Sequence, residues 1–262
     1  MSPIDSATRT VPPPTPSAAP SGSDGGIGGI IGRITEGVSE LIDTVEDVAK
    51  SLLEKIETAA PQVSENERIA RNLVQAGGTG DQSDVNLVVA ELSKMPVTAL
   101  RAMDAGGVKV VACRGSVTDY AADLKGVQPR GWPPGATWDS VPGAYMPDRN
   151  AVVIATTGHG TSAGAHVPAT GEGHGSANLV IHESAHAVDA NVSASINSAS
   201  PGFNAARNAD VAALPAYETQ PGAAGQSESY AESAARYYGG SHGSITTPNL
   251  DAYWRDNPLG GK

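Results

Sequence analysis

Two histidines four residues apart constrain the fold of this chain more than any other feature. They are His182 and His186, in the stretch NLVIHESAHAVDANV (residues 178–192), with Glu183 beside the first. Residues i and i+4 share one face of an α-helix, so both imidazoles can point at a single ion, and Glu183 can take a proton from the attacking water. The HExxH pattern arises by chance in about one of 150 chains with this histidine and glutamate content. We therefore predict a metal-binding helix; the alternative is a core helix with two hydrogen-bonded histidines.

A catalytic zinc ion needs a third protein ligand and one open position. Cys113 is the only cysteine, so the ligands must be histidines and carboxylates. One known extension of the motif requires a glycine and a third histidine after His186, but the chain has Asp189 and Val192 there. A glutamate from a later helix is the other common solution. Asp189 is then either a partner of a ligand histidine or a surface acid.

The stretch SESYAESAARYY, residues 227–238, predicts such a later helix. Its glutamates, Glu228 and Glu232, stand four residues apart, and Ser227 is predicted as the N-cap. One glutamate can bind the metal while the other orients a ligand histidine through its second ring nitrogen. The alternative is an exposed acidic helix face.

Four more histidines are predicted to be surface residues rather than ligands. Three of them lie in a Gly-rich stretch, residues 156–176, whose length is typical of loops at the rim of an active site. They are His159, His166 and His174, and the fourth is His242.

Around these motifs the sequence predicts an α+β domain from residue 64 to residue 262. Ser64 and Glu67 form a capping-box pattern that starts a helix, and residues 83–95, capped by Ser83 or Asp84, and 97–103 predict two more. The β-branched runs 108–115 and 151–156 predict buried strands, and the first of them holds Cys113 as a buried, unreactive thiol. Helices, strands and then helices again point to an α+β fold.

Residues 1–60 have a different composition. Residues 1–30 are rich in Pro, Ser, Gly and Ala and predict a disordered arm. Residues 31–60 predict an amphipathic helix, because apolar residues recur at alternating spacings of four and three. These residues are Ile34, Val38, Leu41, Val45, Val48, Leu52 and Ile56. The helix either packs on the main domain, pairs with a second copy, or acts as a regulatory or delivery segment.

The charge balance excludes some partners. A net charge of −11 and a pI near 4.9 argue against nucleic-acid or anionic-membrane binding, and no apolar run approaches the ~18 residues of a membrane span. The first ten residues lack a basic segment followed by an apolar one, so we expect no ordinary secretory signal. If the protein leaves its cell, we expect secretion or delivery by a non-classical route, with export or packaging machinery engaging residues 1–60; otherwise we expect it in the cytoplasm.

Three stretches of the sequence resemble the catalytic domain of anthrax lethal factor and its relatives, the Pro-Pro endopeptidases. HESAHAVD (182–189) is similar to the metal helix of that family, and ESYAES (228–233) is similar to its glutamate motif. PRGWPPGATWDSVPGAY (129–145), followed by AVVIAT (151–156), resembles the segment that leads to the edge strand of bacterial members. The resemblance covers residues 64–262.

The resemblance implies a zincin-like domain with one zinc ion per chain, held by His182, His186 and Glu228. It implies that Glu183 is the general base and that Tyr217 donates a hydrogen bond to the oxyanion. Tyr217 stands eleven residues before Glu228, whereas the family places this tyrosine seven residues before its glutamate. With Glu228 as the ligand, Glu232 and Asp189 are the candidate outer partners of the site. The edge strand that the resemblance implies for an extended peptide comprises Val152, Val153, Ile154 and Ala155.

The sequence thus favours a zinc-dependent endopeptidase for a specific protein or peptide, of the toxin-like or effector-like kind. A non-catalytic binding module on a zincin scaffold is one alternative, although such a module has no need of Glu183. A delivered structural protein is the other. The sequence does not identify the substrate.

Overall fold

The computed structural model describes residues 27–59, 63–129 and 134–261. The chain divides into two units, residues 1–62 and residues 63–262. In the first unit, α1 (Ile27–Ala59) is a single helix whose described apolar side chains are exposed. A disordered arm was predicted for residues 1–30. Residues 1–26 lie outside the described residues, and residues 27–30 belong to α1. No described helix is long and apolar enough to cross a membrane.

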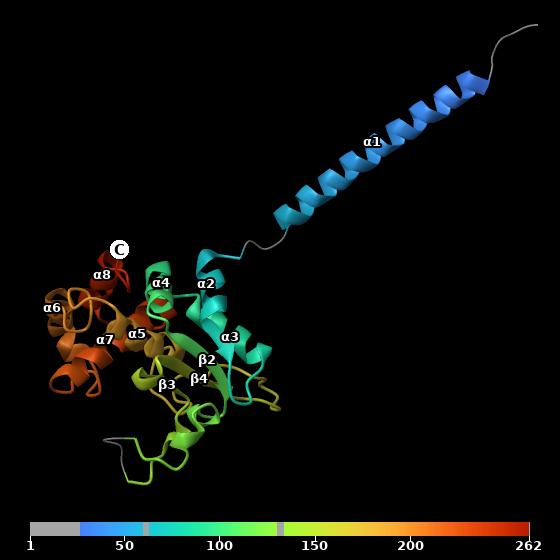
Figure 1. The fold of residues 1–262 in the computed structure, drawn as a ribbon. Coiled ribbons are helices and arrows are strands. Elements are labelled where there is room, and N and C mark those ends of the chain that lie inside the picture. Colours follow the sequence, from blue (N-terminus) through green and yellow to red (C-terminus); the bar gives the residue numbers. More distant parts are fainter. Residues whose placement is uncertain (1–26, 60–62, 130–133, 262) are drawn as a thin grey trace, which may run out of the picture. The chain divides into compact units, whose positions relative to one another are not determined.

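The second unit is built on a small mixed sheet, which confirms the predicted α+β class (Figure 1). Its strands are β1 (Val74–Ala76), β2 (Lys109–Arg114), β3 (Gly143–Met146) and β4 (Ala151–Thr156), in the order β1-β2-β4-β3. β1, β2 and β4 run parallel, and β3 pairs antiparallel with β4. The predicted strands are β2 and β4, whereas β1 and β3 were not predicted from the sequence.

Each face of the sheet is covered, which is why β2 and β4 are apolar along almost their whole length. Alternate side chains, such as Val110 and Ile154, enter a core shared with the helices. The intervening ones, such as Val111 and Val153, enter a second core with Val117 and other residues of the segments before β3. The period of two along each strand therefore divides the interior into two layers.

β4 lies between β2 and β3, so it cannot be the edge strand that was expected to bind substrate. Val152, Val153, Ile154 and Ala155 are all fully buried, and both sides of the strand are paired. The prediction of these four residues as a substrate-binding edge is therefore wrong. The error arose because the short strand β3 gives little periodic signal and was not recognised.

Three helices precede β2: α2 (Glu65–Leu73), α3 (Gln82–Leu92) and α4 (Val97–Ala105). α2 and α3 contact the sheet, whereas α4 packs on α2 and α5. Ser64 caps α2 by accepting a hydrogen bond from the Glu67 amide, as predicted. The cap of α3 is Asp81, not Ser83 or Asp84: the Asp81 carboxylate accepts from the amides of those two residues. The buried carboxylate of Asp84 in turn accepts a hydrogen bond from the Asp81 amide.

The C-terminal half adds α5 (Leu179–Asn191), α6 (Pro201–Asp210), α7 (Ala223–Gly239) and α8 (Pro248–Asp256). α5 lies against the sheet and α7 packs along α5. The core beside α7 is aromatic: Tyr230 stacks edge-to-face on both Phe203 and Trp254. This packing fixes the position of α7 relative to α5, and the candidate site lies between these two helices.

Candidate metal centre

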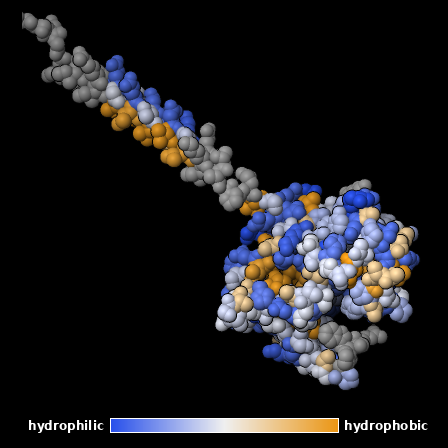
Figure 2. Space-filling view, turned by 180° about the vertical axis from the view of Figure 1, so that it is seen from behind, coloured by the Kyte–Doolittle hydropathy of each residue, from blue (hydrophilic) through white to orange (hydrophobic). Residues whose placement is uncertain are grey.

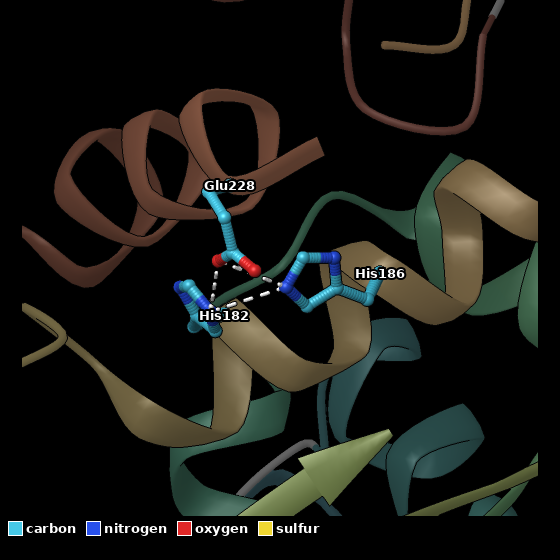
Figure 3. Close-up of side chains that lie close together, drawn as sticks. All are labelled: His182, His186 and Glu228. Carbon is cyan, nitrogen blue, oxygen red and sulfur yellow. Dashed lines mark hydrogen bonds and ion pairs between the residues drawn. The ribbon is translucent and has the colours of Figure 1, made fainter. Parts of the chain in front are cut away.

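His182 and His186 lie on consecutive turns of α5, and Glu228 projects toward them from α7 (Figure 3). Asn178 caps α5 by accepting a hydrogen bond from the Ile181 amide, so the helix begins one turn before His182. α5 keeps most of its side chains buried, which turns the histidine face toward α7 rather than toward bulk solvent. The three residues predicted as ligands are thus brought together by the fold.

The ligand atoms converge on one point. The two Nε2 atoms of His182 and His186 are 3.2 Å apart, and Oε2 of Glu228 lies 3.4 Å from the first and 3.5 Å from the second. Among the described residues these three form the cluster that could hold a metal ion, with ligand atoms within 4.8 Å of one another.

The donor set fits a metal ion. Oε2 of Glu228 is buried and makes no hydrogen bond within the described chain, although a buried carboxylate oxygen ordinarily has a partner. Two imidazole nitrogens and one carboxylate oxygen match a catalytic zinc site of the His₂Glu type. Burial opposes ionisation of Glu228, but the two histidines more than offset it and hold the pKa of the carboxyl well below its usual range.

Glu232 orients the first histidine. Its Oε2 accepts a hydrogen bond from Nδ1 of His182 at 2.9 Å, which leaves Nε2 to face the cluster. Burial alone would lower the pKa of His182, but the carboxylates of Glu228 and Glu232 more than offset it and raise the pKa to about 10. A carboxylate behind a ligand imidazole fixes the ring and increases its basicity.

The second histidine is oriented through a serine. Nδ1 of His186 lies 3.1 Å from Oγ of Ser227, and the Ser227 hydroxyl donates to Oδ2 of Asp189 at 3.4 Å. Asp189 therefore acts on His186 indirectly, while its other oxygen accepts from the Ser198 amide. Ser227 is not the helix cap that was predicted: α7 begins four residues earlier, after Gly222, whose φ of 75° suits a glycine.

Glu183 is held by the edge of the sheet. Its Oε2 accepts a hydrogen bond from the Tyr145 amide of β3 at 2.8 Å. β3 is an edge strand, so this amide is not used within the sheet. Glu183 is half-buried beside the two histidines, a position suited to a general base.

A cavity of about 470 Å³ opens beside the cluster and reaches the base and the tyrosine. His182, Glu183 and Tyr217 contribute to its wall, and the apolar part comes from Val141, Pro142, Leu179, Pro215 and Ile245. Tyr217 is 59% exposed, so a substrate can reach it. Loss of hydration and the nearby carboxylate of Glu228 raise the pKa of its phenol, which keeps the hydroxyl protonated as a donor.

The loop that carries Tyr217 is fixed by a buried ion pair that the sequence analysis missed. Glu218, the next residue, binds Arg236 of α7 with both carboxylate oxygens, at 2.7 and 2.8 Å. Its carbonyl oxygen accepts from Arg207 and from Ser229. The sequence feature that could have indicated this pair is a glutamate next to the candidate tyrosine, together with an arginine about two helical turns after Glu228.

The other histidines lie apart from this cluster. His159 contacts the buried carboxylate of Asp84 at 3.1 Å, His166 pairs with Glu172, and His174 is hydrogen-bonded to the Pro168 carbonyl. None belongs to the metal-binding cluster of the described chain, and neither does His242.

Comparison with known proteins agrees with this geometry. Residues 62–244 match the model of the family "Anthrax toxin lethal factor, N- and C-terminal domain". The Pro-Pro endopeptidase of Paenibacillus alvei is 37% identical over 135 residues, which are 50% of this chain and 57% of that protein. The Pro-Pro endopeptidase of Clostridioides difficile is 34% identical over 115 residues, 43% of this chain and 47% of that protein. The chain thus spans about half the length of these two relatives.

A solved structure extends the match. The structure of the Paenibacillus alvei Pro-Pro endopeptidase is similar to this chain with a TM-score of 0.53 and 30% sequence identity. The match covers 72% of this chain and 92% of that one. The similarity therefore extends well beyond the HExxH motif.

Proposed function

Since the chain belongs to the family of the anthrax toxin lethal factor N- and C-terminal domains, we propose that it is a zinc-dependent endopeptidase. It hydrolyses peptide bonds in a specific protein or peptide substrate. The observation that carries the proposal is the convergence of His182, His186 and Glu228 beside a carboxylate, Glu183, that does not belong to the metal-binding cluster of the described residues. A purely binding module has no need of such a base.

His182, His186 and Glu228 would hold the zinc ion. When bound, zinc polarises the carbonyl of the scissile bond and makes water a better nucleophile at neutral pH. The remaining steps belong to side chains of this protein. Glu183 takes a proton from the attacking water and returns it to the leaving amine.

Tyr217, which lines the same cavity, supports the same step. Its protonated hydroxyl donates a hydrogen bond to the carbonyl oxygen as negative charge develops there. A donor of this kind contributes about 3 kcal/mol to transition-state stabilisation. The buried pair of Glu218 and Arg236 keeps the loop in place, so the hydroxyl needs little reorganisation.

The substrate binds as an extended strand along β3. β3 is at the edge of the sheet, Gly143 lines the cavity, and the Tyr145 amide already reaches Glu183. A peptide that adds to this edge gains main-chain hydrogen bonds while its side chains enter the cavity. The relatives are named for a Pro-Pro bond, and peptides with that bond are the first substrates to test.

The test is digestion of a diverse peptide library, including Pro-Pro peptides, followed by mass spectrometry. We expect cleavage by the wild-type protein and none by Glu183→Ala, with the same zinc content in both. The exposed variant Glu65→Ala serves as the control and should cleave normally. Cleavage that persists in Glu183→Ala, or zinc-loaded wild-type protein that cleaves nothing, would contradict the proposal.

Delivery of the peptidase by a non-classical route is a separate prediction, supported only by the sequence of residues 1–60. Fractionation of cells that produce the full chain tests it. Protein found outside the cell without lysis supports delivery, whereas protein confined to the cytoplasm contradicts it.

A further inference from the structure

The long helix α1 exposes an apolar stripe with a seven-residue repeat. In residues 35–53, the part whose side chains are described, apolar residues alternate at spacings of three and four, as at the a and d positions of a coiled coil. Val38, Val45 and Leu52 occupy the a positions and are 50%, 60% and 54% exposed; Leu41 and Val48, at d, are 65% and 54% exposed. This amount of apolar surface on one helix indicates a partner.

Charge is excluded from the sides of the stripe. The positions that flank a and d hold small or apolar residues: Thr35, Ile42 and Ala49 at e, and Gly37, Thr44 and Ser51 at g. All six charged residues of this stretch fall at b, c or f, on the far side of the helix: Glu36, Glu40, Asp43, Glu46, Asp47 and Lys50. Figure 2 shows the apolar and the charged residues as two separate bands along the described part of α1.

This arrangement suits a second copy of the same helix. Two helices with five acidic residues each would repel one another if their carboxylates met, but here every carboxylate points away from the stripe. A strict seven-residue repeat keeps an apolar stripe in contact with a second helix that supercoils around the first. Packing on a globular surface does not require such a strict repeat. An anionic lipid surface is disfavoured, because five acidic residues against one lysine oppose binding to it.

We propose that α1 associates with α1 of a second copy of this chain in a left-handed coiled coil, so that the protein is at least a dimer. The proposal concerns the first unit only and is independent of peptidase activity.

The first test measures the mass of the full-length protein by sedimentation equilibrium over a range of concentrations. We expect at least twice the chain mass of 26.5 kDa. The double variant Leu41→Glu/Leu52→Glu places charge at d and a and should sediment as a single chain. The matched control Ser39→Glu/Leu53→Glu adds the same charge at two b positions and should sediment like the wild type. A wild-type protein that is monomeric throughout, or a stripe variant as heavy as the wild type, overturns the proposal.

The second test separates a lost interface from a helix that no longer folds. The variant Leu41→Lys/Leu52→Lys should also be monomeric, but an equimolar mixture with Leu41→Glu/Leu52→Glu should recover at least twice the chain mass, because opposite charges then meet in the seam. A mixture that remains monomeric contradicts the coiled coil. Monomeric wild-type protein that co-sediments with lipid vesicles would replace the second copy with a membrane as the partner.

Discussion

Oε2 of Glu232 accepts a hydrogen bond from Nδ1 of His182 at 2.9 Å, one helical turn beyond the ligand Glu228. We predict that Glu232→Gln weakens metal binding by about 10–100-fold, because a neutral amide increases the basicity of the ring less than a carboxylate does. Competition with a chromogenic chelator measures this affinity without reference to catalysis. Glu65→Gln, an exposed change on α2, is the control, and an unchanged affinity of Glu232→Gln would contradict the role given to this carboxylate.

Ser227→Ala should weaken metal binding less than Glu232→Gln does. His186 is oriented by a neutral hydroxyl rather than by a carboxylate, and a hydrogen bond between neutral groups contributes roughly half as much as a charge-assisted one. The same chelator competition gives the order of the two variants. A larger loss for Ser227→Ala would show that the link through Ser227 to Asp189 matters more than the direct contact to Glu232.

Tyr217→Phe should lower kcat by about 10²–10³ with little change in KM, as expected when one oxyanion donor is removed. Zinc content should not change, because Tyr217 does not belong to the metal cluster. Steady-state kinetics on the best library peptide, with Tyr237→Phe as control, test this. An equal loss in kcat for both variants would point to a general structural effect, and no loss would assign the oxyanion contact to another donor.

The sequence was sufficient to predict the cluster of candidate ligands, because residues i and i+4 lie on one face of a helix. His182, His186 and the later glutamates could be assigned a shared site without knowledge of the sheet. Their outer partners were harder to predict. Glu232 follows from helical spacing, whereas Ser227 was taken for a helix cap because serine is favoured both at N-caps and in contacts with neighbouring side chains.

The order of the strands could not be predicted. β3 has four residues, and the strand that looked most like a peptide-binding edge, β4, is apolar because it is buried on both faces. A continuous apolar run indicates burial but not a place in the sheet. The pair formed by Glu218 and Arg236 was missed for a similar reason, since residues 18 apart in the chain meet only after α7 packs on α5.

Removing one partner of the buried pair should be costly. Arg236 and Glu218 are 2% and 1% exposed, so Glu218→Gln removes the two short contacts of the buried guanidinium and leaves it the longer one to Glu232, at 3.7 Å. We expect a loss of about 3–5 kcal/mol in the free energy of unfolding, measured by urea denaturation. The double variant Glu218→Leu/Arg236→Met removes both charges and should lose less than Glu218→Gln. A double variant that is less stable than the single one would contradict this account.

The stability of the fold should also fall at high pH through Cys113. The thiol is fully buried in β2, and burial together with the negative charge of Asp119 raises its pKa to about 12. In the unfolded chain the thiol ionises near ~8.5, so its contribution is complete below that pH and is lost as the pH rises toward 12. At pH 10 the loss is about 2 kcal/mol, because each pH unit above the unfolded pKa corresponds to about 1.4 kcal/mol.

Urea denaturation of the wild type and of Cys113→Ala at pH 7 and pH 10 measures the difference. The wild type should lose more stability between the two pH values than the variant, and an equal loss would show that other groups determine the alkaline limit.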